Sequence, residues 1–492
     1  MSPNDTYLES RKKSLLENRR AFLGRASLGV GSLALATLVG RLPEPSREQI
    51  QSGFRGSLET TQRPPISPPS PTAAKRVIWL YMAGGMSHLE GWDYKPKLLE
   101  MHGKPIPPSM TSGQQIAQLQ GAKRLDCMAP QFPFKKWGSS GLEFSTTFPN
   151  IGKQVADELC LIRSMYTDAI NHDPAHALMN TGSMLPGRPS IGSWLLYGLG
   201  AGRDDLPGFV VMVSTGSYGQ TQPVSSRLWH SGFLPGRYQG VEFRSKGDPV
   251  MYIQNPAGVS RDQQRGVVDA IQELSRLSTD MLDDAEIANR VSQYETAFHM
   301  QTSVPELTDL SNEPRHVLDR YGASAADGSF AANCLMARRL AERGTRFIQL
   351  FHRDWDHHGG VKSNFAGTAA EVDRGVAALI VDLKERGMLD ETLVVLGTEF
   401  GRTPMAQSDG RDHHLAGFSM WLAGGGIKGG IAYGATDDLG YYAVENRTHI
   451  NDVHATVLHR LGLDHRRLTY RHQGRDFRLT DVGGNVIESI LA

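Results

Sequence analysis

Residues 331–396 alternate between helical and strand-like stretches, and this order constrains the fold more than any other feature of the sequence. Helical spacing over Ala331–Arg343 is followed by the apolar run Thr345–Phe351, and helical spacing over Thr368–Arg386 is followed by the apolar run Thr392–Leu396. Strands that are joined through a helix lie parallel in one sheet. The alternation therefore predicts an α/β domain built on a parallel sheet.

Polar residues directly follow each of these strands. Histidines and aspartates are concentrated in residues 352–358 after the first strand, and Gly397–Arg402 follows the second. The run Arg76–Met82 indicates a further buried strand that ends in a glycine turn, and Phe418–Leu422 indicates another. Ligands bind beyond the carboxyl ends of strands in open α/β sheets. We therefore expect a functional site at this edge of the sheet.

The charge balance excludes a dedicated nucleic-acid binder. The 492 residues include 52 Lys plus Arg and 52 Asp plus Glu, whereas such proteins usually have a basic excess. The cysteines Cys127, Cys160 and Cys334 form no CxxC pair, which excludes thiolate zinc sites and a disulfide scaffold but leaves one disulfide possible. Residues 260–300 have helical spacing, and no repeat or second linker interrupts the chain. We expect one large domain over residues 76–492.

The N-terminal segment has the features of a targeting signal and a tether. Arg19 and Arg20 precede the uncharged apolar stretch Ala26–Gly40, which is too short to span a bilayer comfortably. Residues 1–41 resemble a twin-arginine signal, and the stretch lacks the polar face of an amphipathic helix. Residues 42–75 are rich in Pro and Ser and predict a linker. We expect export to the periplasm or cell surface by the twin-arginine machinery, with no stable membrane span in the mature form.

The densest group of potential metal ligands follows the first strand of the alternating region. Asp354, Asp356 and His358 combine carboxylate oxygens with an imidazole, and Gly359 and Gly360 would let the loop turn around an ion. A divalent ion such as zinc, calcium or manganese takes this mixture of ligands. The alternative is a solvated polar loop, but the position after a predicted strand favours the metal site.

Two later segments can contribute to the same site. His413 or His414 lies in a polar cluster before the strand at residue 418 and could complete the metal site, unless the cluster is a surface turn. Glu399 follows a buried strand, where a carboxylate is costly to desolvate unless it binds a metal or forms an ion pair. Arg402 is the candidate partner for such a pair.

A short helix is predicted to begin at Pro174 and to end before Gly182. His172 precedes it, and a side chain at a helix start can meet an anion in the field of the N-terminal amides. The alternative is a capping or buried histidine. His88 and Glu90 follow the first strand and are weaker candidates for additional metal ligands or bases.

Several long segments, in one order, resemble a known family. They are MAGGMSHLEGWDYKP, NHDPAHALMNTGS with GRPSIGSW, DWDHHGG, TEFGRTP, GRDHH, GGGIKGGIAYGATDDLGYYAV and QGRDFRLTD. From about Arg76 to the C-terminus they are similar to the twin-arginine-exported, sulfatase-like family filed as domain of unknown function 1501. The resemblance implies an alkaline-phosphatase-like α/β fold, with a mixed, mainly parallel sheet sandwiched by helices, in the superfamily of phosphatases, sulfatases and phosphomutases.

The superfamily's metal ligands carry over to this sequence only in part. Asp354 and His358 match its Asp-x3-His pair, and His413 or His414 matches its later histidine, which implies one intact metal site. The superfamily's Gly-Asp-Gly after the first strand is Ala-Gly-Gly here, and its Asp-His-Gly is Glu-Phe-Gly beginning at Glu399. The resemblance thus implies an altered second metal site.

The resemblance also bears on the nucleophile. His172, Pro174 and His176, running into Thr181 and Gly182, are similar in spacing to the sulfatase motif Cys-x-Pro-Ser-Arg running into Leu-Thr-Gly. A histidine therefore occupies the nucleophile position. Histidine cannot become the formylglycine that sulfatases derive from Cys or Ser, which argues against a conventional sulfatase mechanism.

We therefore expect an exported metal-dependent hydrolase of a phosphate or sulfate ester, either of a small molecule or of a polysaccharide. His172 is either a ligand of a reorganised second metal site or a covalent nucleophile. The ligand role is favoured because attack by water needs no nucleophilic side chain. Arg188 and Arg163 could clamp the anionic ester, unless they are ordinary surface arginines. The alternative function is a non-catalytic binding or scaffold protein with a degenerate hydrolase site.

Overall fold

The computed structural model describes most of the chain from residue 74 onward. The described residues are 74–492 except 204, 215, 248, 251–254, 256–257, 261, 271–272, 274–284 and 324–326. The predicted signal at 1–41 and nearly all of the predicted linker at 42–75 lie outside them, so both stay predictions. In the described part of the chain, no helix combines the length and the apolar character needed to cross a membrane.

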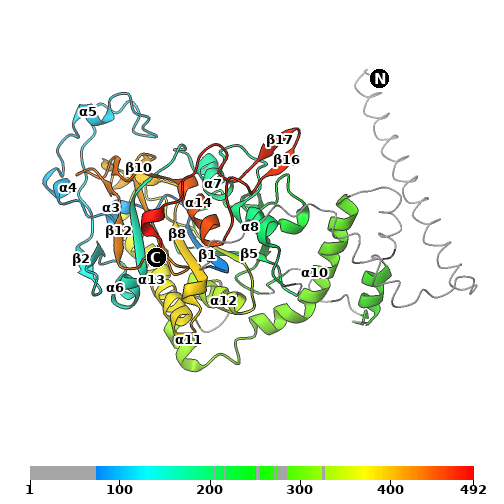
Figure 1. Cartoon of the computed structure of the whole chain (residues 1–492). Coiled ribbons are helices and arrows are strands. Elements are labelled where there is room, and N and C mark those ends of the chain that lie inside the picture. The colour runs from blue at the N-terminus through cyan, green and yellow to red at the C-terminus, as the bar shows by residue number, and fades with distance from the viewer. Residues whose placement is uncertain are drawn as a thin grey trace, which may run out of the picture. The chain divides into compact units, whose positions relative to one another are not determined.

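Nine of the described strands form the main sheet (Figure 1). Its order is β12-β4-β11-β8-β1-β7-β5-β6, and β15 also pairs with β4. In chain order these strands are β1 (Arg76–Met82), β4 (Leu159–Tyr166), β5 (Phe209–Ser214), β6 (Val241–Phe243), β7 (Phe347–His352), β8 (Thr392–Gly397), β11 (Phe418–Ala423), β12 (Ile431–Tyr433) and β15 (Thr448–His449).

The sheet is mixed but mainly parallel, as predicted. Strand β1 pairs in parallel with both β7 and β8 at its centre, so the strands of the alternating region are neighbours of the first strand. Strand β11 alone is antiparallel to its neighbours β4 and β8. The carboxyl ends of β4, β8, β1 and β7 therefore lie at one edge, where the functional site was expected.

Side chains of β1 alternate between two buried cores, one on each face of the sheet. Ile78, Leu80 and Met82 belong to the core beneath α12 and α13, and Trp79 and Tyr81 belong to the core beneath α7, α8 and α14. Figure 1 shows β1 and β8 between these two sets of helices. This burial on both faces explains the continuous apolar runs of the central strands.

The helices and small hairpins complete the fold. The helices are α3 (His88–Gly91), α4 (Pro96–Glu100), α5 (Pro108–Thr111), α6 (Pro149–Val155), α7 (His172–Thr181), α8 (Ile191–Leu199), α10 (Ala285–Thr308), α11 (Arg315–Tyr321), α12 (Phe330–Glu342), α13 (Val361–Glu385) and α14 (Ile450–Arg460). The hairpins are β2 (Phe134–Trp137) with β3 (Leu142–Ser145), β9 (Gly401–Gln407) with β10 (Gly410–His414), β13 (Ala435–Thr436) with β14 (Ala443–Glu445), and β16 (Tyr470–His472) with β17 (Arg475–Phe477).

Some details differ from the sequence predictions. Helix α7 begins at His172, two residues before the predicted start, with Asn171 as its N-cap; Pro174 lies within the first turn, where a proline is tolerated. The predicted helical insertion is helical at 262–270 and again in α10, and part of it lies outside the described residues. The three cysteines are buried and free, so the possible disulfide is absent.

Candidate functional site

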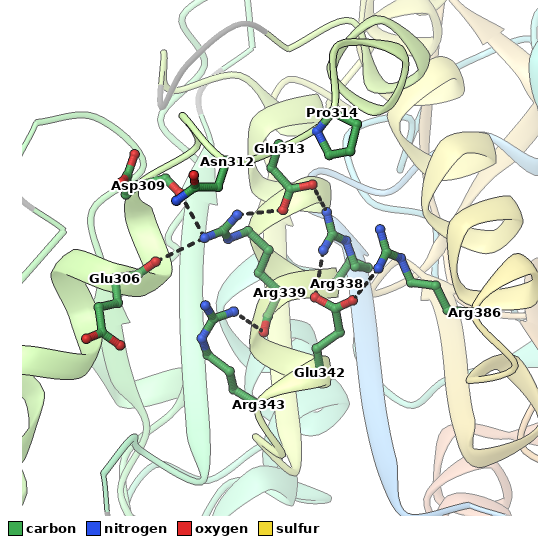
Figure 2. Close-up of a pocket in the computed structure, with 10 residues that line it drawn as sticks. All are labelled: Glu306, Asp309, Asn312, Glu313, Pro314, Arg338, Arg339, Glu342, Arg343 and Arg386. Carbon is green, nitrogen blue, oxygen red and sulfur yellow. Dashed lines mark hydrogen bonds and ion pairs between the residues drawn. The ribbon is translucent and has the colours of Figure 1, made fainter.

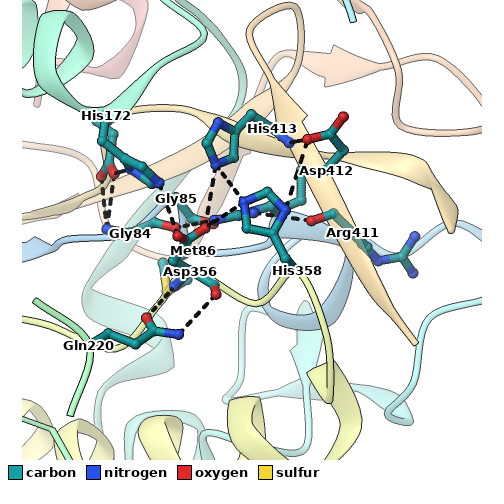
Figure 3. Close-up of polar contacts among 12 residues, drawn as sticks. Gly84, Gly85, Met86, His172, Gln220, Asp356, His358, Arg411, Asp412 and His413 are labelled. Atoms are coloured by element: carbon teal, nitrogen blue, oxygen red, sulfur yellow. Dashed lines mark hydrogen bonds and ion pairs between the residues drawn. The ribbon is translucent and has the colours of Figure 1, made fainter. Parts of the chain in front are cut away.

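Five polar side chains from four segments meet at the carboxyl edge of the sheet, and Figure 3 labels His172, Asp356, His358 and His413 among them. His172 begins α7, which follows β4, while Asp356 and His358 follow β7. Glu399 follows β8, and His413 lies on β10. The parallel arrangement of β8, β1 and β7 therefore brings together residues that are more than 200 positions apart in the sequence.

Asp356 is the centre of the cluster. Its Oδ1 lies 3.1 Å from His358 Nε2 and 3.4 Å from His413 Nε2, and its Oδ2 lies 3.2 Å from His172 Nε2. Arg402 Nη2 donates to Oδ1 over 2.5 Å. Burial alone would raise the pKa of the Asp356 carboxyl, but the three histidines and Arg402 outweigh it and hold this pKa well below its usual range. Asp356 is therefore a carboxylate at neutral pH.

His358 and His413 direct their Nε2 lone pairs toward Asp356, and the Gln118 side-chain amide lies 3.4 Å from His358 Nε2. His358 Nδ1 donates to Gln407 Oε1, and His413 Nδ1 donates to the Ile170 carbonyl over 2.8 Å. In the neutral rings each Nε2 then carries a lone pair, and these two atoms are only 2.9 Å apart. Burial lowers the pKa of His413 to about 4, which keeps that ring neutral. Two facing lone pairs beside a carboxylate repel one another unless a cation lies among them.

His172 lies between two carboxylates. Its Nδ1 is 2.7 Å from Glu399 Oε1, and its Nε2 faces Asp356 Oδ2. Burial would lower the pKa of His172, but hydrogen bonds to Asp356 and Glu399 outweigh burial and raise it to about 9. Each ring nitrogen therefore needs a positive centre, either a proton or a metal ion.

Glu399 is buried beneath His172. Both of its carboxylate oxygens accept from the Gly84 amide, at 3.0 and 3.2 Å. Burial would raise its pKa, but His176 and His172 outweigh burial and lower it to about 2. Gly84 has a φ of +127°, and a Cβ there would lie 2.6 Å from the Asp356 amide nitrogen. A glycine is therefore required where the superfamily has an aspartate, and Glu399 accepts from its amide.

The arrangement fits a divalent metal ion. Single ligand atoms of His172, Asp356 and His413 lie within 4.8 Å of one another, and His358 Nε2 lies beside them. Imidazole nitrogens with a carboxylate oxygen are typical ligands of zinc and related transition-metal ions. The hydrogen bonds from His358 Nδ1 and His413 Nδ1 fix the tautomer that such an ion requires.

Asp354 does not join this cluster, although the resemblance made it the first metal ligand. Its backbone is left-handed, with a φ of +74°. Its carboxylate is fully buried and accepts from the backbone amides of Tyr218, Gly219 and Gln220 at 2.6 to 3.1 Å. It anchors the loop after β5, and Asp356 takes the place that was assigned to it.

Three further candidates lie in structural networks. His414 Nε2 contacts the Tyr441 carbonyl, which leaves His413 as the histidine of the site. His88 Nε2 lies 3.0 Å from the Gly440 carbonyl. Glu90 forms a fully buried ion pair with Arg411. These contacts hold loops around the site, and none of these side chains lies in the cluster around Asp356.

The two arginines expected to clamp an ester also lie elsewhere. Arg188 packs over the Phe477 ring, 4.3 Å from its centroid, and faces Asp481. Arg163 donates to the carbonyls of Trp92 and Glu143. Both side chains have structural partners, so the assignment of either to an ester clamp has no support from the geometry.

The comparison with known families rests on nearly the whole described chain. A family model described as Protein of unknown function (DUF1501) matches residues 74–491. The chain belongs to the DUF1501 family. No curated protein matches the sequence. The family resemblance of the sequence motifs is thereby confirmed, and it brings no established activity with it.

Solved structures with partial likeness to the DUF1501 chain include three hydrolases. A sulfatase from Pseudoalteromonas sp. is 14% identical, with 85% of this chain and 72% of that chain covered and a TM-score of 0.31. A phosphonate monoester hydrolase from Silicibacter pomeroyi is 11% identical, with 85% and 76% covered and a TM-score of 0.33. An alkaline phosphatase from the Antarctic bacterium TAB5 is 11% identical, with 79% and 98% covered and a TM-score of 0.32. Likenesses at this level carry no argument about the site of this chain.

Three residues have contacts in the DUF1501 site that the sequence analysis did not assign to them. Arg402 pairs with Asp356 rather than with Glu399. Gln220 exchanges hydrogen bonds with the backbone of Asp356 through its side-chain amide. His176 lies one helical turn after His172 and 3.6 Å from Glu399. Only the contact of His176 could have been predicted from the sequence, because His172 and His176 are four residues apart and therefore share one face of a helix.

A separate pocket of about 510 Å³ lies between the end of α10, the loop at 309–314, α12 and the C-terminal end of α13 (Figure 2). Its arginines are engaged with the protein itself. Arg338 pairs with Glu313 and Glu342, and Arg339 donates to Glu313 and to the carbonyls at the end of α10. Arg386 also pairs with Glu342. These contacts tie the helices together and explain the arginines without a ligand.

Proposed function

We propose that this DUF1501 chain is an exported metal-dependent hydrolase of a phosphate or sulfate ester. The observation that carries the proposal is the convergence of Asp356 with two histidine Nε2 atoms that lie 2.9 Å apart. Asp356, His358 and His413 would hold the ion. Their nitrogen-rich set favours zinc over calcium or manganese.

When bound, such an ion polarises an ester oxygen or lowers the pKa of a water molecule. The residues of the chain hold the ligands in place for this chemistry. Arg402 fixes Asp356, Gln407 fixes the tautomer of His358, and the Ile170 carbonyl fixes that of His413. Each ligand is therefore oriented before an ion or a substrate arrives, which is how metal sites gain affinity and precision.

The cluster is accessible from solvent. The side chains of Asp356 and His358 keep 21% and 25% of their exposure, and that of His172 keeps 16%. The exposed parts of Asp356 and His358 therefore leave the cluster open to an ion and to the charged end of an ester. This accessibility supports a catalytic site over the scaffold alternative, in which the cluster would be sealed.

The contacts of His172 support a ligand or electrostatic role over a nucleophilic one. A nucleophilic Nε2 must present its lone pair to the reacting phosphorus or sulfur atom. Here Nε2 faces the carboxylate of Asp356 at 3.2 Å. His172 therefore links Asp356 to Glu399 and holds the positive charge or the proton between them.

The test is metal content together with ester hydrolysis. The full chain is supplied with zinc or manganese, desalted and analysed by elemental mass spectrometry, and is assayed on chromogenic phosphate monoesters, phosphate diesters and sulfate esters. We expect bound metal and hydrolysis of one ester class in the wild type. His413→Gln should lose this ion and lower kcat/KM at least 100-fold. A wild-type chain that binds no metal would instead support the scaffold function.

A further inference from the structure

We propose that His172, His176 and Glu399 form a second cation site, distinct from the site of Asp356, His358 and His413. The inference rests on the proposed function and deepens it, because it gives the same hydrolase a second ion. Single ligand atoms of the three residues lie within 4.8 Å of one another. The set contains two nitrogens and one oxygen, which suits a transition-metal ion such as zinc.

His176 supplies the decisive observation. The side chain is fully buried, and its Nδ1 lies 2.7 Å from the Tyr81 hydroxyl. Its Nε2 has no hydrogen-bond partner and faces Glu399 Oε1 at 3.6 Å, which is too long for a hydrogen bond. A buried polar atom is costly to leave unpartnered. A cation among His176, Glu399 and His172 would satisfy it.

The tautomers of the three rings are consistent with two separate sites. If His172 Nε2 donates to Asp356 Oδ2, its Nδ1 carries the lone pair that faces Glu399 at 2.7 Å. His172 then serves the second site through Nδ1. Asp356, His358 and His413 serve the first, and the ion pair between His172 Nε2 and Asp356 Oδ2 links the two.

The charge of Glu399 also calls for a cation. This carboxylate is fully buried, and its neighbours include the Gly84 amide, the Thr398 hydroxyl and the two histidines. Arg402, which the sequence offered as its partner, is engaged with Asp356 instead. A buried carboxylate needs a compensating charge. Helix α7 places both histidines on the face that meets Glu399, because they are four residues apart.

The experiment counts ions in variants that affect one site each. The full chain is loaded with zinc, and bound zinc is measured by elemental mass spectrometry in the wild type, His176→Gln and His413→Gln. His454→Gln is the control, because His454 is equally buried and contacts the Met179 carbonyl outside the site. We expect two ions per chain in the wild type and the control, and one ion in each site variant.

A second measurement covers the case in which His176→Gln fails to fold. Calorimetric titration of metal-free wild type with zinc should show two binding events. Tyr81→Phe removes only the hydroxyl that contacts His176 and should weaken one of the two events 10- to 100-fold.

The outcomes separate the two proposals. A wild type that binds one ion, lost in His413→Gln and kept in His176→Gln, overturns the second site and leaves the proposed function standing. Two ions that persist in His176→Gln also overturn it. A wild type that binds no zinc contradicts the proposed function itself.

Discussion

Asp354 and Asp356 are two residues apart, yet their carboxylates have different roles. Asp354 holds the loop after β5 through three backbone amides, and Asp356 contacts three histidines. We expect Asp356→Asn to abolish binding at the first metal site, because an amide oxygen is a much weaker ligand than a carboxylate. Asp354→Asn should keep the ion but lower the free energy of unfolding by about 1–3 kcal/mol, because the buried amides lose a charged acceptor. Calorimetric zinc titration and urea unfolding measure the two effects.

Each variant is the control for the other. If Asp354→Asn loses the ion while remaining folded, the assignment of Asp356 as the ligand is wrong. The sequence could not distinguish the two aspartates, because their spacing to His358 is compatible with a metal site in both cases. The left-handed backbone conformation of Asp354 distinguishes the two residues, and no local sequence pattern predicts that conformation.

At the scale of the element, α7 positions His172 and depends on how the helix ends. Gly182 terminates α7 in the left-handed conformation, and a Cβ there would lie 1.9 Å from the Leu479 carbonyl oxygen. Gly322 terminates α11 in the same conformation, but a Cβ there would meet the end of the Arg374 side chain at 3.0 Å. Backbone cannot move aside as a flexible side chain can. We expect Gly322→Ala to cost about 1 kcal/mol and Gly182→Ala to cost about 3 kcal/mol or more, measured by urea unfolding.

Equal costs for the two glycine variants would show that the collision with Leu479 is relieved by a small shift.

The elements themselves were largely predictable, since β1, β7, β8 and β11 lie within one or two residues of their expected bounds. The apolar runs and the helical spacing between them are strong signals. The start of α7 was displaced by two residues, because a proline fits any position of the first turn and Pro174 is the third residue of the helix rather than the first.

At the scale of the whole molecule, the edge of the sheet that carries the site followed from the order of helices and strands. Parallel strands place their carboxyl ends together, so His172, Glu399 and the residues after β7 had to be near one another. The order of helices and strands did not predict which side chains would pair across the fold. Arg402 with Asp356, and Tyr81 with His176, are contacts between side chains from different elements, which depend on the final packing. Arg188 likewise does not act as the predicted ester clamp, because its side chain contacts Asp481 and the Phe477 ring.

Acid should destabilise the whole domain, because histidines are buried as neutral rings far from the site. Burial lowers the pKa of His454 to about 4, against about 6.5 in the unfolded chain. The unfolded chain therefore binds the proton more strongly, and the free energy of unfolding is greatest above pH 6.5 and falls as the pH drops toward 4. One such histidine accounts for about 2 kcal/mol between pH 7 and pH 5. We expect urea unfolding with a chelator present to show that the free energy of unfolding falls between pH 7 and pH 5 by about 2 kcal/mol less in His454→Gln than in the wild type. An equal loss in both proteins would mean that His454 is not the group that takes up the proton.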